Sequence, residues 1–192
     1  MRKAEIVHRA ECYRGFYRME RVALRHDRHG GTTTPTLTRE LVSRSDIVAV
    51  IPYDPVTDKV VLIEQFRPGA LVAGADPWLL EIVAGHLEPG EAPEDAARRE
   101  TVEETGCDVR MLMPLATYFL APNLSPDRVH LFQAEVTAPP VEHLCGRDDE
   151  DEDIRVMPVD RIEALAMVGD GRITSPWTLL ALVLLQQRMP PA

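Results

Sequence analysis

The chain has 192 residues, 45% of them hydrophobic, with 21 Lys and Arg against 31 Asp and Glu and a formal net charge of −10. This composition suits one folded domain with a small annex and excludes a disordered tail or a collagen-like chain. The acidic balance argues against nucleic acid as a partner, because binding a phosphate backbone requires a concentrated basic surface. Cys12, Cys107 and Cys145 are widely spaced and form no CxxC motif, which predicts free thiols.

The chain offers no sequence signal for a membrane. Its longest apolar run, residues 179–185, is far short of the roughly 20 residues that a spanning helix needs. The N-terminal sequence MRKAEIVHRAEC has no apolar signal core. We therefore expect a cytoplasmic protein that does not bind membranes.

The first 45 residues predict a small β region. Residues 5–44 alternate polar with aromatic or branched side chains and are interrupted by HGGTTTP, a pattern typical of antiparallel strands joined by a turn. Such strands are too few to bury both faces. We therefore expect this region to pair with a second copy of the chain in a homodimer.

Denser apolar runs begin at Asp46 and predict the main domain, residues 46–192. Two runs flank the turn sequence DPVTDK and favour a hairpin, and three later runs favour further strands: 47–54 and 60–66, then 78–84, 111–121 and 129–136. Three helices are predicted, each from its terminal residues or periodicity: 93–105, 160–168 and 175–188. This order predicts an α/β fold, an α/β/α sandwich with a mixed sheet, preceded by the small N-terminal antiparallel β region.

Three glutamates share one strip of the first predicted helix. At about 100° per residue, Glu103 and Glu104 fall on either side of Glu100. The three carboxylates repel one another. One interpretation is a solvated helix face on which Arg99 forms an ion pair with Glu103. A bound divalent cation would reverse the repulsion, because Mg²⁺ prefers carboxylate oxygens and keeps positions open for phosphates.

The spacing around this strip decides between these interpretations. Gly85, five residues, Glu91, seven residues and the sequence RETVEETG together resemble the Nudix box. Thr101 and Cys107 depart from the pattern, which has aliphatic residues at these two positions. These positions have a packing role and no catalytic role in the family. The segments YRGFY, VVLIEQFRPGA and EDEDI extend the resemblance to the ADP-ribose pyrophosphatase group of dimeric bacterial Nudix hydrolases.

The resemblance implies Mg²⁺-dependent hydrolysis of ADP-ribose to AMP and ribose 5-phosphate, with Mn²⁺ as an alternative ion. It implies metal ligation by the carbonyl of Ala84 and by Glu100, Glu103, Glu104 and Glu152, with Glu150 as the general base. Glu91 and Arg99 are expected to hold the loop and orient the glutamates. The residues implied to contact substrate are Phe16, Tyr17, Arg39, Glu40, Arg67, His86, Ala121, Pro122, Asn123 and Asp127.

Two other functions stay open from the sequence. One is a pyrophosphatase for another nucleoside diphosphate sugar, such as GDP-mannose, acting through the same metal ligands. The other is a non-catalytic sensor of ADP-ribose. We rank the sensor below the enzymes because this chain retains the glutamates and has only about twenty residues beyond Asp170.

Overall fold

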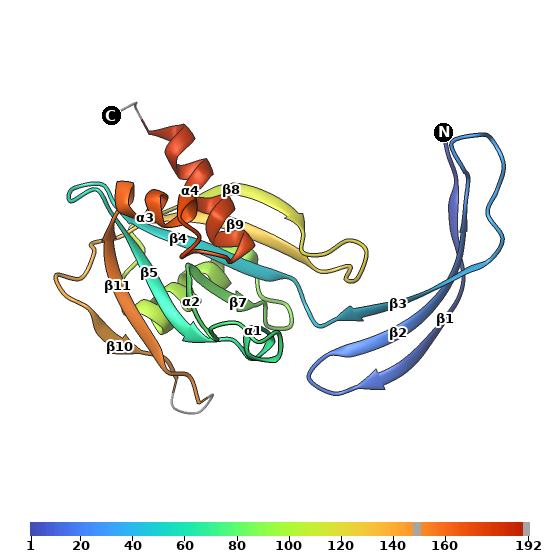
Figure 1. Cartoon of the computed structure of the whole chain (residues 1–192), viewed down its shortest axis with the longest axis horizontal. Coiled ribbons are helices and arrows are strands. Elements are labelled where there is room, and N and C mark those ends of the chain that lie inside the picture. The colour runs from blue at the N-terminus through green and yellow to red at the C-terminus, as the bar shows by residue number, and fades with distance from the viewer. Residues whose placement is uncertain (148–150, 190–192) are drawn as a thin grey trace. The chain divides into compact units, whose positions relative to one another are not determined.

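The computed structural model describes residues 1–147 and 151–189, which form two compact units (Figure 1). The smaller unit consists of residues 1–46 and 118–128. The larger unit consists of residues 47–117 and the described residues from 129 onwards.

The smaller unit contains a three-stranded antiparallel sheet in the order β1-β2-β3, formed by Ala4–Arg14, Arg18–His26 and Leu37–Ser43. Only Ala10 of β1 is even partly buried. In β2 the side chains of Glu20 and Val22 are buried. The strands predicted in residues 5–44 are thus present, but they enclose very little apolar core.

The strand prediction was wrong at Phe16 and Tyr17. We interpreted these residues as alternating within a strand, whereas they lie in the turn between β1 and β2. The amide of Gly15 donates a hydrogen bond of 2.9 Å to the carbonyl of Tyr17, which closes the turn. Both rings are therefore exposed at the end of a hairpin.

The larger unit contains an eight-stranded mixed sheet with the main order β10-β11-β5-β4-β9-β8. Strands β4 and β9 are parallel, and the other registered pairs are antiparallel. The strands in chain order are β4 (Ile47–Asp54), β5 (Lys59–Phe66), β6 (Trp78–Glu81), β7 (Val83–His86), β8 (Met111–Phe119), β9 (Arg128–Glu135), β10 (His143–Cys145) and β11 (Ile154–Asp160). The last two were not predicted from the sequence.

The predicted hairpin of β4 and β5 opens after two residue pairs. The strands pair only at Tyr53 with Val60 and at Asp54 with Lys59, and beyond these positions β7 pairs with β4 while β6 pairs with β5. The single apolar run at residues 78–84 therefore forms two strands, with the buried Ile82 between them. The amide of Ile82, which lies outside both strands, donates a hydrogen bond to the hydroxyl of Thr178, 3.0 Å away.

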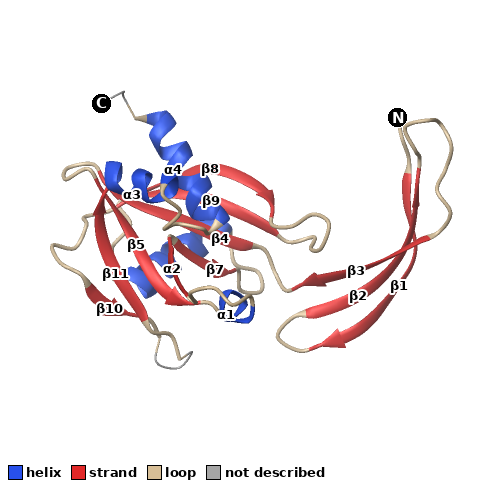
Figure 2. Cartoon of the chain, in the orientation of Figure 1, coloured by secondary structure: helices blue, strands red, loops and turns tan. Residues whose placement is uncertain are grey.

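Helices cover both faces of this sheet (Figure 2). Val48 and Val50 of β4 pack in one apolar cluster with Ala96 and Ala97 of helix α2 (Pro93–Thr105). Ala49 and Ile51 point to the opposite face, because side chains alternate along a strand, and helix α4 (Pro176–Arg188) contacts β4 as well. Helix α3 (Arg161–Gly169) packs against α4, and a short helix, α1 (Pro68–Val72), follows β5.

This arrangement confirms the predicted α/β fold with its mixed sheet and N-terminal antiparallel region. All three predicted helices are present. Ser175 takes the N-cap position of α4, but its side chain makes no capping hydrogen bond. Among the described residues, every helix is too short or too polar to cross a membrane.

We expect Asp54→Ala to destabilise the larger unit. Asp54 is only 2% exposed, and its carboxylate accepts hydrogen bonds from the amides of Val56 (2.9 Å) and Ala138 (3.1 Å). Burial alone would raise the pKa of this carboxyl, but these hydrogen bonds lower it below its usual value. Removing the acceptor leaves both amides without this partner and a cavity in place of the buried carboxylate, which costs about 2 kcal/mol.

The pH dependence of this cost has a defined sign. Since the pKa of Asp54 is lower in the folded state, its contribution is present at neutral pH and declines as the pH falls below about 4, the ordinary carboxyl range. Urea unfolding of both proteins at pH 7 and pH 3 measures the difference, with the exposed Asp108→Ala as control. A difference that stays constant over this interval would contradict the proposed linkage.

Candidate active site

Helix α2 carries the glutamate strip, and its ends follow from the sequence. Pro93 occupies the first helical turn, where its missing N–H costs no hydrogen bond. Gly106 ends the helix in the left-handed conformation, with φ of 68°, which glycine adopts without steric penalty. The helix therefore spans the residues that the box predicts.

Thr101 and Cys107, the two residues that depart from the Nudix box, are both buried, which agrees with the packing role expected for them.

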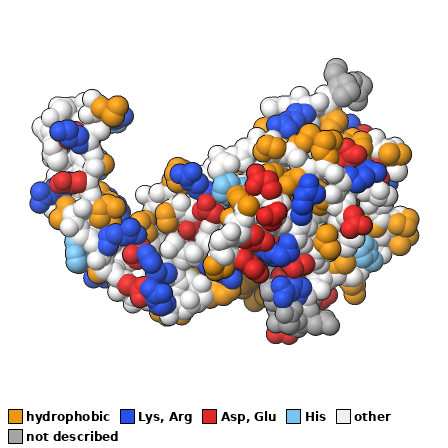
Figure 3. Space-filling view, turned by 180° about the vertical axis from the view of Figure 1, so that it is seen from behind, with side chains coloured by type: hydrophobic (Ala, Val, Ile, Leu, Met, Phe, Trp, Pro, Cys, Tyr) orange, Lys and Arg blue, Asp and Glu red, His pale blue; other side chains and the backbone are white. Residues whose placement is uncertain are grey.

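Arg99 binds three carboxylates at once. Its Nε and a terminal nitrogen donate to the two oxygens of Glu91, at 2.9 and 3.0 Å. Its other terminal nitrogen donates to Glu100 at 2.8 Å and to Glu103 at 3.0 Å. Figure 3 shows one face of the larger unit on which acidic side chains gather beside basic ones.

Glu91 also fixes the loop before the helix, because its carboxylate accepts the amide of Glu88 at 2.9 Å. Its hydrogen bonds from Arg99 lower the pKa of its carboxyl. Arg99 and Glu91 thus hold the loop and the glutamates together, which is the arrangement that their predicted orienting roles require.

Glu104 is the most buried acid of the strip. It is 2% exposed, and its carboxylate accepts the amide of Ala84 at 3.2 Å. Burial, together with the negative charges of Glu100 and Glu152, raises its pKa well above the usual value. Burial likewise raises the pKa of Glu100, against the effect of Arg99. Negative charge is thus concentrated beside the peptide of Ala84 without enough positive charge to balance it.

This donor set fits a hard divalent cation. The negative charge of Glu152 raises the pKa of both Glu100 and Glu104, and the charge of Glu100 also raises the pKa of Glu104; a bound cation would remove that penalty. Among the described residues, no three acidic, His or Cys side chains already converge on one point. Mg²⁺ does not need such a cage, since it is commonly held by one or two carboxylates plus water and substrate phosphates.

Glycine at position 85 makes room for Glu100. A Cβ placed on Gly85 would overlap the Glu100 carboxylate. Strand β7, which carries Ala84 and Gly85, therefore packs against helix α2 with Glu100 at the contact.

The acidic loop before β11 is described only in part. The predicted base, Glu150, lies outside the described residues. Glu152 is described, and its amide donates to the carbonyl of Arg147 at 3.2 Å. Arg147 in turn lies 3.8 Å from a carboxylate oxygen of Glu103. The structure thus brings Glu152 to the glutamate strip, as predicted.

Arg67 lies directly after β5 and donates from Nε to Glu81 at 2.6 Å. Its positive charge lowers the pKa of Glu104, so its guanidinium lies near that carboxylate. His86 ends β7, and its carbonyl lies 3.4 Å from a terminal nitrogen of Arg99. Glu81 was not predicted as a site residue from the sequence, where it is the polar position in the otherwise apolar run WLLEIVA.

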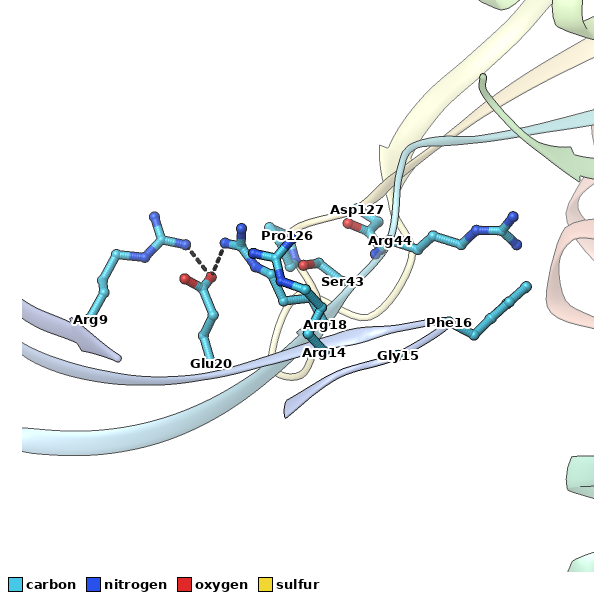
Figure 4. Close-up of a pocket in the computed structure, with 10 residues that line it drawn as sticks. All are labelled: Arg9, Arg14, Gly15, Phe16, Arg18, Glu20, Ser43, Arg44, Pro126 and Asp127. Atoms are coloured by element: carbon cyan, nitrogen blue, oxygen red, sulfur yellow. Dashed lines mark hydrogen bonds and ion pairs between the residues drawn. The ribbon is translucent and has the colours of Figure 1, made fainter. Parts of the chain in front are cut away.

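The smaller unit holds the remaining predicted residues. Phe16 and Tyr17 meet edge to face with ring centroids 5.0 Å apart. The guanidinium of Arg44 lies 3.8 Å from the centroid of the Phe16 ring, at one side of a pocket of about 400 Å³ (Figure 4). Arg39 and Glu40 of β3 are exposed. Arg44 is an unpredicted neighbour of the predicted adenine-facing residue.

Residues 121–127 form a turn in the same unit. The carbonyl of Ala121 accepts the amides of Leu124 and Ser125, both at 2.7 Å. Asp127 is 8% exposed and accepts the amide of Arg44 at 3.0 Å. Asp127 thus ties this turn to the chain after β3, and Pro122 and Asn123 lie within the turn.

Comparisons with known proteins agree with this geometry. The NUDIX domain model matches residues 43–178. The ADP-ribose pyrophosphatase of Escherichia coli (strain K12) is 39% identical over 182 residues, covering 95% of this chain and 87% of that protein. The GDP-mannose pyrophosphatase of Pectobacterium atrosepticum is 35% identical over 145 residues, covering 75% of this chain and 74% of that protein.

A solved structure also shares the fold. A crystal structure of an ADP compounds hydrolase matches with a TM-score of 0.73 and 21% identity, covering 96% of this chain and 93% of that one. The domain match, the identity over nearly the whole chain and the glutamate helix all point to one family. The chain belongs to the Nudix family of hydrolases.

Proposed function

We propose that this protein hydrolyses the diphosphate of ADP-ribose to AMP and ribose 5-phosphate, with Mg²⁺ as cofactor. The observation that carries the proposal is the pair of glutamates beside β7: the buried Glu104, which accepts the amide of Ala84, and the partly buried Glu100, which adjoins Gly85. The extent of similarity to ADP-ribose pyrophosphatases supports this substrate, because the relative from Escherichia coli covers 95% of this chain, whereas the GDP-mannose pyrophosphatase covers 75%.

The side chains divide the chemistry between them. Glu100, Glu104 and Glu152, with the carbonyl of Ala84, would hold Mg²⁺, and Glu103 would contribute more weakly. The chemistry supplied by the bound ion is neutralisation of diphosphate charge and activation of water. Arg67 would hold the diphosphate oxygens, Arg99 and Glu91 would orient the glutamates, and Glu150 would accept the proton of the attacking water.

The substrate contacts are proposed from the same resemblance. Phe16 and Tyr17 would face adenine. Arg39 and Glu40 would reach the substrate from a partner subunit. His86 and the turn at residues 121–127, with Ala121, Pro122, Asn123 and Asp127, would line the terminal ribose. The expected cytoplasmic location also stays a prediction.

Product analysis tests the proposed function. The protein is incubated with ADP-ribose, GDP-mannose and other nucleotide sugars, with and without Mg²⁺, and kcat/KM is compared across the panel. We expect the highest value for ADP-ribose, with AMP and ribose 5-phosphate as products only when Mg²⁺ is present. A higher value for GDP-mannose would favour the second candidate, which the similarity to GDP-mannose pyrophosphatases supports.

We predict that Glu150→Gln lowers kcat while leaving KM for ADP-ribose nearly unchanged. General-base catalysis typically contributes 10²- to 10⁴-fold, and the amide cannot accept the proton. Steady-state kinetics measures both constants, with Glu142→Gln, an exposed acid outside the proposed site, as control. A near-normal kcat would overturn the assignment of Glu150 as the base.

We also propose a homodimer formed through the N-terminal region. The small sheet leaves large hydrophobic side chains exposed, among them Ile6, Val7 and Tyr13 at 49–60%. Exposed large hydrophobic side chains on a sheet with so little core favour a partner surface. Light scattering at micromolar concentration is expected to give twice the chain mass, and a monomeric mass would refute the dimer.

A further inference from the structure

Glu81 is a buried carboxylate at the site to which no role has been given. Its side chain is 3% exposed, and Oε2 lies 2.6 Å from Nε of Arg67, whose side chain is 32% exposed. A carboxylate so deeply buried is costly unless it is paired. The pair is therefore needed by the folded protein, and the open question is whether it serves only stability.

The geometry of the pair favours a second purpose. Arg67 binds Glu81 through Nε, the nitrogen nearest the backbone. Within residues 1–147 and 151–189, neither terminal nitrogen of Arg67 has a hydrogen-bond partner. A guanidinium anchored at Nε keeps its two terminal nitrogens available as a fork for phosphate oxygens.

The surrounding strands fix the direction of this fork. Glu81 lies opposite Ile63 in the β5–β6 register, and Gln65 lies opposite Leu79. Since Ile63 packs in the α2 cluster, Gln65 and Glu81 point to the face of the sheet that carries the glutamate helix. The Nε2 atom of the buried Gln65 has no hydrogen-bond partner among the described residues. This face of the sheet therefore still has an unused hydrogen-bond donor near Glu81.

We propose that Glu81 is a positioning residue for the diphosphate: it holds Arg67 through Nε so that both terminal nitrogens face the substrate. This inference rests on the proposed function, since it deepens the role of Arg67 in binding a diphosphate. Arg67 alone could adopt many rotamers, whereas Arg67 held by a buried carboxylate loses little freedom when substrate binds.

A double-mutant cycle tests the inference. Arg67→Ala, Glu81→Ala and the double variant are assayed for kcat and KM with the nucleotide sugar that the wild type hydrolyses best. Calorimetry measures binding of Mg²⁺–pyrophosphate to the same proteins. We expect each single variant to lose about 10- to 100-fold in kcat/KM and in pyrophosphate affinity. We expect the double variant to lose no more than Arg67→Ala alone, because both changes remove one function.

Conservative variants separate positioning from stability. Glu81→Gln retains an acceptor for Nε and should recover much of the lost affinity. Asp58→Asn is the matched control, because Asp58 forms a paired, partly buried contact with Arg161, at 2.7 and 2.9 Å, at the turn between β4 and β5. It should lower the melting temperature without changing pyrophosphate affinity.

The outcomes distinguish the inference from the proposed function. Unchanged pyrophosphate affinity in Glu81→Ala, or losses that multiply in the double variant, would overturn the positioning role. If the wild type hydrolyses no nucleotide sugar, the proposed function fails, while the pyrophosphate measurement still decides the role of Glu81. If the wild type binds no pyrophosphate, the inference fails with the role of Arg67.

Discussion

Glu104→Gln is expected to abolish nearly all turnover without destabilising the metal-free protein. The amide is nearly isosteric but carries no charge, so the proposed metal site loses its most buried carboxylate. In the folded protein, burial and the charges of Glu100 and Glu152 already disfavour the ionised form of Glu104. Removing that charge relieves repulsion, and the melting temperature in EDTA should stay the same or rise.

Two measurements check this expectation. AMP release is expected to fall by at least 100-fold, and calorimetry should show weaker Mg²⁺ binding. Glu94→Gln is the matched control, because Glu94 lies in the first turn of the same helix and is exposed. Near-normal turnover in Glu104→Gln would refute its role as a metal ligand, and a large drop in melting temperature would show that its charge supports the fold.

The regular elements could be predicted from local patterns, and the errors arose where tertiary pairing decided the outcome. Helix α2 follows from Pro93 and Gly106, whose backbone preferences are local. The run at residues 78–84 is apolar except for Glu81, and only its separate pairing with β5 and β4 divides it at Ile82. The turn at Phe16 and Tyr17 was missed because Gly15 alone marks it.

The candidate site shows the same division. Glu100, Glu104 and Arg99 were found because one helix holds them at a recognisable spacing. Glu81 and Arg67 are 14 residues apart, and nothing in that spacing indicates a contact. Their pairing depends on the β5–β6 register, which is a property of the assembled sheet. A polar residue inside the apolar run WLLEIVA was the one available signal, because buried carboxylates require partners.

Gly85→Ala is expected to separate folding from catalysis. A Cβ at position 85 would overlap the carboxylate of Glu100, which is the flexible end of a long side chain and can move aside. The fold should therefore survive with little change in melting temperature. Glu100, however, could no longer occupy its position beside Arg99 and the backbone of residue 85.

The expected loss of activity in Gly85→Ala is about 100-fold in kcat/KM, the usual effect of displacing a reacting group by an ångström. Mg²⁺ affinity should fall as well, because Glu100 is a proposed ligand. Gly169→Ala is the matched control, since a Cβ there meets no atom within 4 Å and the substitution should leave both quantities unchanged. Full activity in Gly85→Ala would mean that Glu100 functions in a different position, and the metal site would then have to be built on Glu104 and Glu152 instead.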